Sequence, residues 1–310
     1  MITVSDLTKI YGSQRAIDGI HFQIGAGEIV GFLGPNGAGK TTTMKIITCF
    51  MPPSSGTVQV DDLNIRDHSL QIRKRIGYLP EHNPLYLDMY VHEYLRFVGR
   101  LYHLSAKAMA RRVPEIIELT GLGREQHKKI GTLSKGYRQR VGLSQALIHD
   151  PDILILDEPT TGLDPNQIVE IRSLIREIGR SKTVIFSTHI LPEVEAIADR
   201  VLILHRGKIV ADEALADLRT NAVKENVLQI AFDKPGFACA PVQESHPDVR
   251  IQEEGNSGRE FTFHSPADTD LRMTIMTQSI AQGNPIAALH KKEKKLEEVF
   301  RSLTNVTLEK

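Results

Sequence analysis

The chain has 310 residues, of which 41% are hydrophobic and 25% are charged, and its 38 Lys and Arg residues balance 38 Asp and Glu residues. Such a composition is typical of a globular protein that forms one large domain or two ordinary ones. The even balance of charge argues against the basic stripe or domain that marks most nucleic-acid-binding proteins, so we expect no nucleic acid as a partner.

The sequence carries no pattern typical of secretion or membrane insertion. No apolar run approaches the ~20 residues that a membrane-spanning helix needs. The N-terminal MITVSDLTKIYG lacks a basic segment followed by an apolar one. The two cysteines, Cys49 and Cys239, are too few for a disulfide framework. We therefore expect a cytoplasmic protein.

Strand patterns dominate the N-terminal part of the chain. Strands are expected at residues 2–10, 16–24, 28–34, 57–65 and 75–79. The third of these stops at a glycine-rich loop, and the apolar spacing in the following TTTMKIITCF predicts a helix over 41–50. A strand, a glycine-rich loop and a helix therefore follow one another directly.

Helical periodicity replaces the strand pattern between about residues 85 and 150 and predicts a helical insertion. Helices are expected at 92–102, 110–122, 134–148 and 166–178. Strands are expected at 152–159, 183–189 and 200–212, the last with a hairpin turn at Arg206-Gly207. Continuous apolar strands that alternate with helices predict a parallel sheet covered on both faces.

The sequence changes character beyond about residue 220. Polar-alternating strands are expected at 226–234, 249–255 and 259–265, followed by a helix from Asp270, a strand at 284–290 and a helix at 291–303. These elements predict a small α+β domain. We therefore divide the chain into a first domain over 1–220 and a C-terminal accessory domain over 221–310.

The residues GPNGAGKTT at 34–42 fit the glycine-rich loop that binds nucleotide phosphates. Glycines let the backbone approach the phosphates, and the helix that starts there adds the positive end of its dipole. Lys40 supplies a cation for the β- and γ-phosphates, and Thr41 offers a hydroxyl to Mg²⁺. The candidate nucleotide-binding residues of this loop are Gly34, Pro35, Asn36, Gly37, Ala38, Gly39, Lys40, Thr41 and Thr42.

A phosphate loop alone fits a kinase, a GTPase or an ATPase. The segment ILILDEP narrows the choice, because it places Asp157 at the carboxyl end of a buried strand, where such sheets bind ligands. Asp157 can hold Mg²⁺ through water. Glu158 can orient or deprotonate an attacking water, which a small-molecule kinase does not need. An acidic pair that caps the next helix is the alternative interpretation.

A basic cluster, LSKGYRQR, occupies residues 133–140, shortly before that strand. With both nucleotide motifs placed, the cluster resembles the signature motif of ABC-transporter ATPases, usually written LSGGQ. Lys135 stands where this family usually has glycine, and Tyr137 stands where it usually has glutamine. Ser134 and Gly136, the phosphate-facing positions, are kept.

Other residues resemble the same family, in the same order, over about residues 1–220. Tyr11 matches the aromatic residue that stacks on adenine. Asp164 in TGLDP matches the aspartate of the loop after the acidic strand, and His189 in STH matches the switch histidine. Glu81 stands where the family usually has glutamine, and a carboxylate there can still reach Mg²⁺.

The resemblance implies an α/β P-loop fold of the ABC type, with a RecA-like parallel core sheet, an antiparallel β-subdomain and a helical insertion. It implies ATP hydrolysis, with ATP and Mg²⁺ as cofactors. Tyr11 and the phosphate loop would bind ATP, while Thr41, Asp157 and Glu81 would serve the metal. Glu158 would position the attacking water, and His189 would touch the γ-phosphate.

The resemblance also implies partners. Two copies would face head to tail, so that Ser134, Gly136 and Asp164 of one copy complete the ATP site of the other. A separate membrane permease, contacted around residues 85–110, would hold the chain on the cytoplasmic face of the cell membrane. LEEVF at 296–300 resembles the tail of separate-chain exporter ATPases, and residues 78–95 resemble the gliding-motility ATP-binding subunit.

Two alternatives stay open. The first is a non-transport ABC ATPase, although the chain has neither the two ATPase domains of the translation-factor type nor the long coiled coil of the chromosome type. The second is a regulatory or scaffolding module that binds ATP without turnover. The presence of both Glu158 and His189 argues against the second alternative.

Overall fold

The computed structural model describes residues 1–221, 225–255, 257–266, 269–292 and 300. The chain divides into two compact units, Met1–Leu215 and Ala216–Lys310. The assignment of residues 1–220 to one functional domain and of residues 221–310 to an accessory domain stays a prediction. Within the described ranges, no helix combines the length and the apolar composition that crossing a membrane requires.

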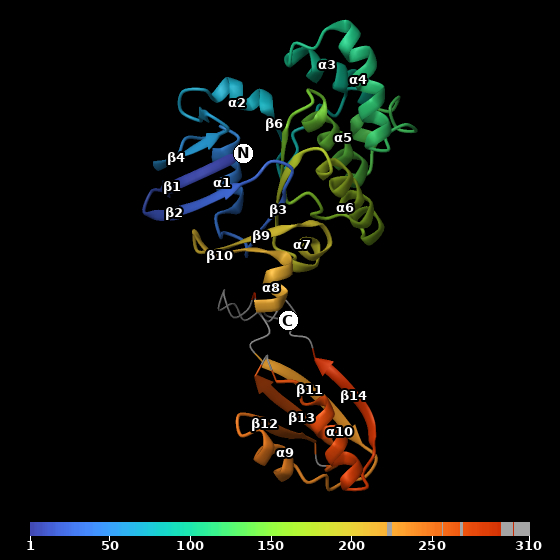
Figure 1. Cartoon of the computed structure of the whole chain (residues 1–310). Helices are drawn as coiled ribbons and strands as arrows, with labels where there is room; N and C mark the ends of the chain where they lie inside the picture. The colour runs from blue at the N-terminus through green and yellow to red at the C-terminus, as the bar shows by residue number, and fades with distance from the viewer. Residues whose placement is uncertain (222–224, 256, 267–268, 293–299, 301–310) are drawn as a thin grey trace. The chain divides into compact units, whose positions relative to one another are not determined.

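A six-stranded sheet with the order β10-β9-β3-β8-β7-β6 forms the centre of the first unit (Figure 1). Its strands are β3 (Ile29–Leu33), β6 (Ile76–Leu79), β7 (Ile153–Asp157), β8 (Thr183–Thr188), β9 (Arg200–His205) and β10 (Lys208–Ala214). All neighbours pair in parallel except β9 and β10, which form the predicted hairpin. Every residue of β3, β7 and β8 is buried, as expected for parallel strands covered on both faces.

The register of this sheet brings three loops to one edge. Leu33 at the end of β3 pairs with Thr188 at the end of β8, and Asp157 at the end of β7 pairs with Ser187. The carboxyl ends of parallel strands are where such sheets bind ligands. The loops that follow β3, β7 and β8 are therefore neighbours, although their residues lie far apart in the sequence.

A smaller antiparallel sheet with the order β2-β1-β4-β5 lies beside the parallel sheet. Its strands are β1 (Ile2–Tyr11), β2 (Gln14–Ile24), β4 (Ser55–Val60) and β5 (Leu63–Asn64). The single strand predicted over 57–65 is wrong, because Asp61 adopts a φ of 52° and turns the chain between β4 and β5. Helix α1 (Lys40–Ile47) packs between the two sheets, and its Met44, Ile46 and Ile47 join one apolar core with residues of both.

The predicted helical insertion is confirmed. It consists of α3 (Val91–Leu101), α4 (Ala106–Leu119), the 3₁₀ turn η1 (Ile130–Thr132) and α5 (Lys135–Leu147). In Figure 1, α3 and α4 lie together at the end of the unit farthest from β10. A short helix that the sequence did not predict, α2 (Ser69–Arg75), leads into β6.

Two helices cover the face of the parallel sheet opposite α1. Helix α6 (Pro165–Gly179) matches the helix predicted over 166–178, begins after the N-cap Asp164 and packs against β8. Helix α7 (Leu191–Ile197) was not predicted and packs against β3 and α6. Helix α8 (Leu215–Asn221) ends the first continuous stretch of described residues.

The second unit is an α+β fold, as predicted. Its antiparallel sheet has the order β12-β13-β11-β14, and α10 (Arg272–Ala281) and α9 (Ala240–Ser245) contribute to its core. The strands are β11 (Glu225–Phe232), β12 (Arg250–Glu254), β13 (Glu260–Pro266) and β14 (Ile286–Lys292). The helix predicted over 291–303 is wrong at Lys291 and Lys292, which pair with β11. The rest of it, apart from Phe300, lies outside the described residues.

Candidate functional site

The predicted phosphate loop joins β3 to α1. Lys40 is the first residue of α1, and Gly39 is its N-cap with a φ of 111°. A side chain at Gly39 would place its Cβ 2.6 Å from the carbonyl oxygen of Ala16, so only glycine fits there. The loop therefore wraps the N-terminus of α1, where free backbone N–H groups favour an anion.

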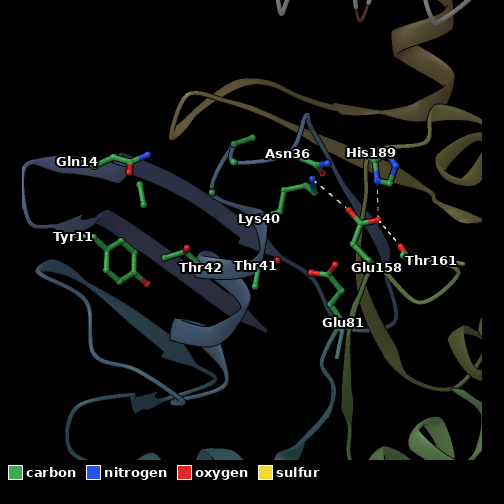
Figure 2. Close-up of a pocket in the computed structure, with 14 residues that line it drawn as sticks. Tyr11, Gln14, Asn36, Lys40, Thr41, Thr42, Glu81, Glu158, Thr161 and His189 are labelled. Carbon is green, nitrogen blue, oxygen red and sulfur yellow. Dashed lines mark hydrogen bonds and ion pairs between the residues drawn. The ribbon is translucent and has the colours of Figure 1, made fainter. Parts of the chain in front are cut away.

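A pocket of about 450 Å³ opens over this loop (Figure 2). Predicted site residues that line it are Tyr11, Asn36, Gly37, Ala38, Gly39, Lys40, Thr41, Thr42, Glu81, Glu158 and His189. Gln14, Ala16 and Thr161 complete the lining and were not predicted. The pocket therefore gathers residues of the antiparallel sheet, of the start of α1 and of loops that are distant in sequence.

Lys40 and Glu158 form a buried pair at the centre of this pocket. Lys40 Nζ donates hydrogen bonds to the carbonyl oxygens of Gly34 at 2.7 Å and Pro35 at 3.3 Å. The same Nζ lies 3.4 Å from Glu158 Oε1. The two residues are 5% and 7% exposed, and pairing offsets the cost of burying each charge.

Glu158 is held in an uncommon backbone conformation. Its φ of 49° lies in the left-handed region, which is unfavourable for a glutamate. Its backbone N–H donates to Ser187 Oγ at 2.9 Å, and Thr161 Oγ1 donates to its Oε2 at 3.3 Å. His189 Nδ1 lies 3.0 Å from the same Oε2. These contacts, from β8, from the loop after it and from the turn that follows Glu158 itself, fix the carboxylate toward the pocket.

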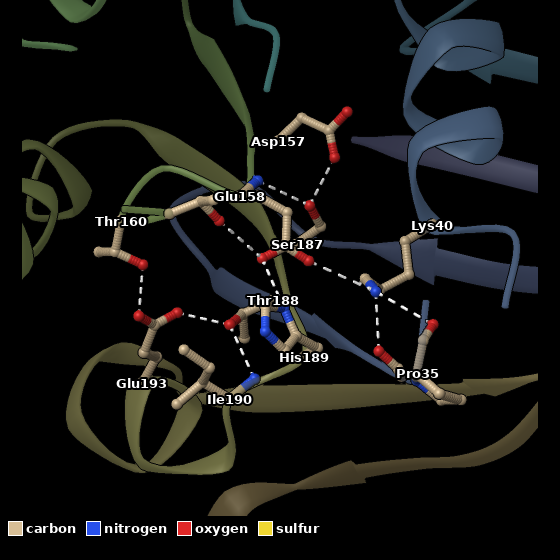
Figure 3. A network of polar contacts seen from close by, with 12 residues as sticks. Pro35, Lys40, Asp157, Glu158, Thr160, Ser187, Thr188, His189, Ile190 and Glu193 are labelled. Atoms are coloured by element: carbon tan, nitrogen blue, oxygen red, sulfur yellow. Dashed lines mark hydrogen bonds and ion pairs between the residues drawn. The ribbon is translucent and has the colours of Figure 1, made fainter. Parts of the chain in front are cut away.

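Asp157 lies beside this pair (Figure 3). Its Oδ1 accepts hydrogen bonds from Thr41 Oγ1 at 3.0 Å and from Ser187 Oγ at 2.6 Å. Its Oδ2 is buried and has no hydrogen-bond partner among the described residues. Burial raises the pKa of this carboxyl, and the negative charges of Glu81 and Glu158 raise it further. The position therefore favours a cation.

The residues predicted to bind the metal suit a Mg²⁺ ion that is shared with substrate phosphates better than a metal ion that is bound by protein side chains alone. Among the described residues, no cluster of three His, Cys, Asp or Glu side chains could hold a metal ion. Mg²⁺ is usually bound through one or two carboxylates together with substrate phosphates. Asp157 with its unpartnered oxygen, the Thr41 hydroxyl and the pocket-lining Glu81 match that requirement.

Tyr11 forms the wall of the pocket farthest from Glu158 (Figure 2). Its side chain is 44% exposed at the end of β1. Its hydroxyl lies 3.0 Å from Met51 Sδ, and Lys9 Nζ lies 5.4 Å from the ring centre. Because the ring is half-exposed and lines the same pocket as the phosphate loop, it leaves a face on which a planar base can stack.

Ser134 and Gly136 do not line the described pocket. Ser134 is the N-cap of α5, and its Oγ accepts a hydrogen bond from the backbone N–H of Tyr137 at 3.4 Å. Gly136 is buried under Gln167, whose Cδ would lie 2.4 Å from a Cβ at that position. The positive end of α5 is therefore built in this chain but lies apart from this chain's own pocket.

Two cationic residues of α5 and the predicted Asp164 are engaged within the first unit. Lys135 Nζ lies against Gly162, where it would be 1.9 Å from an added Cβ. Arg140 donates to the carbonyl oxygen of Thr120 and forms an ion pair with Glu170. Asp164 caps α6 by accepting from the Gln167 N–H at 2.9 Å. Asp164, like Ser134 and Gly136, is absent from the described lining.

Comparisons with known proteins give one consistent result. The sequence model of the family described as ABC transporter matches residues 17–161. An uncharacterized ABC transporter ATP-binding protein of Bacillus subtilis, YxlF, is 32% identical over 308 residues, covering 97% of this chain and 98% of YxlF. The Nod factor export ATP-binding protein I of Ralstonia nicotianae is 32% identical over 312 residues, covering 98% and 94%.

A solved structure agrees with these sequence relatives. It is a dimeric structure of a post-hydrolysis state of the ATP-binding cassette MJ0796 bound to ADP and Pi. The two chains are 28% identical and superpose with a TM-score of 0.64 over 69% of this chain and 99% of the cassette. The similarity therefore extends across almost the whole length of that cassette.

Proposed function

Because this chain belongs to the ATP-binding proteins of ABC transporters and hydrolyses ATP, we propose that it powers a membrane exporter through a separate permease. The description of the Ralstonia relative as a Nod factor export protein supports the direction of transport. The gliding-motility type suggested by residues 78–95 stays a prediction, and neither sequence relative named above is described as that type.

The contacts around Lys40, Glu158 and His189 carry the ATP-hydrolysing part of this proposal. They place a cation, a carboxylate and an imidazole in one pocket. Lys40 Nζ lies 3.4 Å from Glu158 Oε1, and His189 Nδ1 lies 3.0 Å from Glu158 Oε2. In the proposed reaction Lys40 and the loop N–H groups bind the β- and γ-phosphates. Glu158 orients the attacking water and accepts its proton. His189 holds the Glu158 carboxylate and contacts the γ-phosphate.

Thr41, Asp157 and Glu81 are the residues that would hold Mg²⁺ beside the phosphates. When bound, this ion neutralises negative charge on the phosphate oxygens. Asp157 would contribute its Oδ2, which has no partner among the described residues, because Thr41 and Ser187 already donate hydrogen bonds to Oδ1. Tyr11 stacks on the adenine at the other end of the pocket. The alternative of a module that binds ATP without turnover is not favoured, since the family shows hydrolysis.

We further propose that two copies act as a head-to-tail pair. The N-terminus of α5 has no acidic residue in its first turn, and its Ser134 is exposed. A γ-phosphate held by a second copy satisfies this positive helix end. The dimeric state of the related cassette supports such a pair. The permease would then hold both copies on the cytoplasmic face of the membrane.

Light scattering on the purified chain tests the paired arrangement. Glu158→Gln should bind ATP, hydrolyse it at least ~100-fold more slowly, and form an ATP-dependent dimer. Adding Ser134→Arg should return the protein to a monomer that still binds ATP, because the side chain blocks the partner's phosphate. Ser181→Arg is the matched control, since this exposed serine precedes β8 at the opposite edge of the sheet.

The result that contradicts the pair is a Glu158→Gln protein that binds ATP and stays monomeric. A dimer that ignores Ser134→Arg equally removes α5 from the interface. Affinity purification from membranes tests the transport role: we expect a membrane-spanning protein to copurify with the chain. Recovery of the chain only from the soluble fraction, without such a partner, contradicts that role.

A further inference from the structure

Glu193 is the most deeply buried acidic residue of α7, with only 1% of its surface exposed. Neither the phosphate loop nor the pocket lining contains it. Burial of a carboxylate is unfavourable by several kcal/mol unless hydrogen bonds and charges compensate it. Its neighbours therefore show what this carboxylate does.

Two threonines donate hydrogen bonds to the two oxygens of Glu193 (Figure 3). Thr160 Oγ1 donates to Oε1, and Thr188 Oγ1 donates to Oε2 at 2.5 Å. Thr188 Oγ1 also accepts a hydrogen bond from the backbone N–H of Ile190 at 3.0 Å. Thr160 and Thr188 are 4% and 0% exposed, so water does not compete for these bonds.

One threonine lies in the loop that carries Glu158, and the other is the strand residue directly before His189. Thr160 follows Glu158 by two residues and opens the turn that leads to Gly162 and Asp164. Thr188 is the last residue of β8 and directly precedes His189. Glu193 is thus a bridge between the loop of the general base and the loop of the histidine.

We infer that Glu193 is a positioning residue for ATP hydrolysis. By binding Thr160 and Thr188 together, it fixes the distance between the Glu158 carboxylate and the His189 ring. It also links His189 to the 161–164 loop, so that a change in that loop when a second copy binds is transmitted to the histidine. This inference rests on the roles proposed above for Glu158 and His189.

A purely stabilising role explains the arrangement less well. The only cation found near Glu193 among the described residues is Arg172, whose Nη2 lies 3.9 Å from Oε1. Arg172 Nε is itself buried without a partner, so the ion pair is poorly formed. An apolar side chain would fill such a site without charge burial. The carboxylate instead matches two hydroxyl donors on two different loops.

Steady-state kinetics of the full-length chain tests this inference. Glu193→Gln replaces one accepting oxygen by a donor and should lower kcat by ~10- to 100-fold, because the base and the histidine lose their alignment. KM for ATP should stay within about twofold, since Glu193 contacts no pocket residue that binds the nucleotide. Glu195→Gln, the same change two residues along α7, is the control and should leave kcat unchanged.

Two further variants keep Glu193 in place and separate positioning from folding. Thr160→Val and Thr188→Val each replace one hydroxyl by a methyl group of similar size, and each should lower kcat. Because both act through one carboxylate, the double variant should lose little more than the worse single variant. In the Glu193→Gln background, neither threonine change should lower kcat further.

Three outcomes overturn the inference. They are a folded Glu193→Gln protein with wild-type kcat, threonine effects on kcat that multiply independently, and threonine effects that persist in full without Glu193. A parallel Glu158→Gln variant separates this inference from the proposed function. If Glu158→Gln keeps wild-type turnover, the role proposed for Glu158 is wrong. If Glu158→Gln loses turnover but the variants of Glu193 and the two threonines do not behave as expected, the role of Glu158 stands and the inference about Glu193 is wrong.

Discussion

The charge on Asp157 is unfavourable for the fold and useful for the site. Its carboxyl has a pKa above the ordinary value of 3.8, mainly because of burial. The folded chain therefore binds this proton more tightly than the unfolded chain does. The stability that this group contributes is present at low pH and is lost as the pH rises through the raised pKa.

Asp157→Asn should accordingly raise the melting temperature at neutral pH, by about 2–4 °C if the buried charge is unfavourable by about 1 kcal/mol. The difference from wild type should shrink as the pH is lowered toward the pKa of Asp157, where the wild-type carboxyl becomes neutral. ATP hydrolysis should be lost at every pH. Calorimetry across this pH range checks the sign, and a variant less stable than wild type at neutral pH would contradict it.

Tyr11 allows a second prediction at the same scale. Tyr11→Ala should weaken ATP binding by about 1–3 kcal/mol, because the base loses the ring on which it stacks. Tyr11→Phe keeps the ring and removes only the hydroxyl near Met51, so its affinity should stay close to wild type. Isothermal titration with ATP distinguishes these results. Equal affinities for all three proteins would mean that Tyr11 has only a structural role at the end of β1.

Elements with continuous patterns could be predicted from the sequence, whereas short helices could not. The buried strands β3, β7 and β8 have apolar centres, and α6 has a full amphipathic period. Helices α2, α7 and α9 have six or seven residues each, too few for a period to stand out. They form because tertiary packing covers them, a contribution that local sequence does not reveal.

The candidate site likewise contains residues that the sequence could predict and residues that it could not. Lys40, Asp157 and Glu158 belong to motifs whose spacing indicates phosphate and metal chemistry. Glu193 belongs to no such motif, and its partner Thr160 lies 33 residues away. From sequence alone, a glutamate in a short helix that was not predicted would be interpreted as a charged residue on the surface. Only the sheet register, which places β7 beside β8, brings the two threonines to it.

Packing between α5 and the loop that carries Glu81 gives a prediction at the scale of elements. A Cβ at Gly142 would lie 1.6 Å from Asn83 Nδ2, and both amide atoms of Asn83 are buried without partners among the described residues. Gly142→Ala should destabilise the protein by about 1–3 kcal/mol, because Asn83 must move.

The size of this effect should depend on Asn83. In an Asn83→Ala background the nearest obstacle is gone and only Leu79 Cδ1, 2.8 Å from the added Cβ, must still move, so Gly142→Ala should be clearly less destabilising than in the wild-type background. Thermal unfolding of the four proteins measures the difference. If Gly142→Ala has the same effect in both backgrounds, this contact does not determine the packing of the loop.

At the scale of the whole molecule, every residue that lines the described pocket lies in the first unit. A fragment that ends at Asn221 keeps all of α8 and should bind ATP within about threefold of the full chain, since it loses no contact to the nucleotide. Calorimetric titration of a fragment with native circular dichroism checks this expectation. A folded fragment without ATP binding would place part of the site beyond residue 221.

The order of strands in the parallel sheet also has a consequence for synthesis on the ribosome. Strand β3, which ends at the phosphate loop, pairs only with β8 and β9 in the described sheet. About 150 residues separate β3 from β8, so at ~5–20 residues per second the emerging loop waits roughly 8–30 s for its neighbouring strand. A message that ends before the codon for Thr188 therefore yields a chain that carries the complete phosphate-loop motif and cannot build the site.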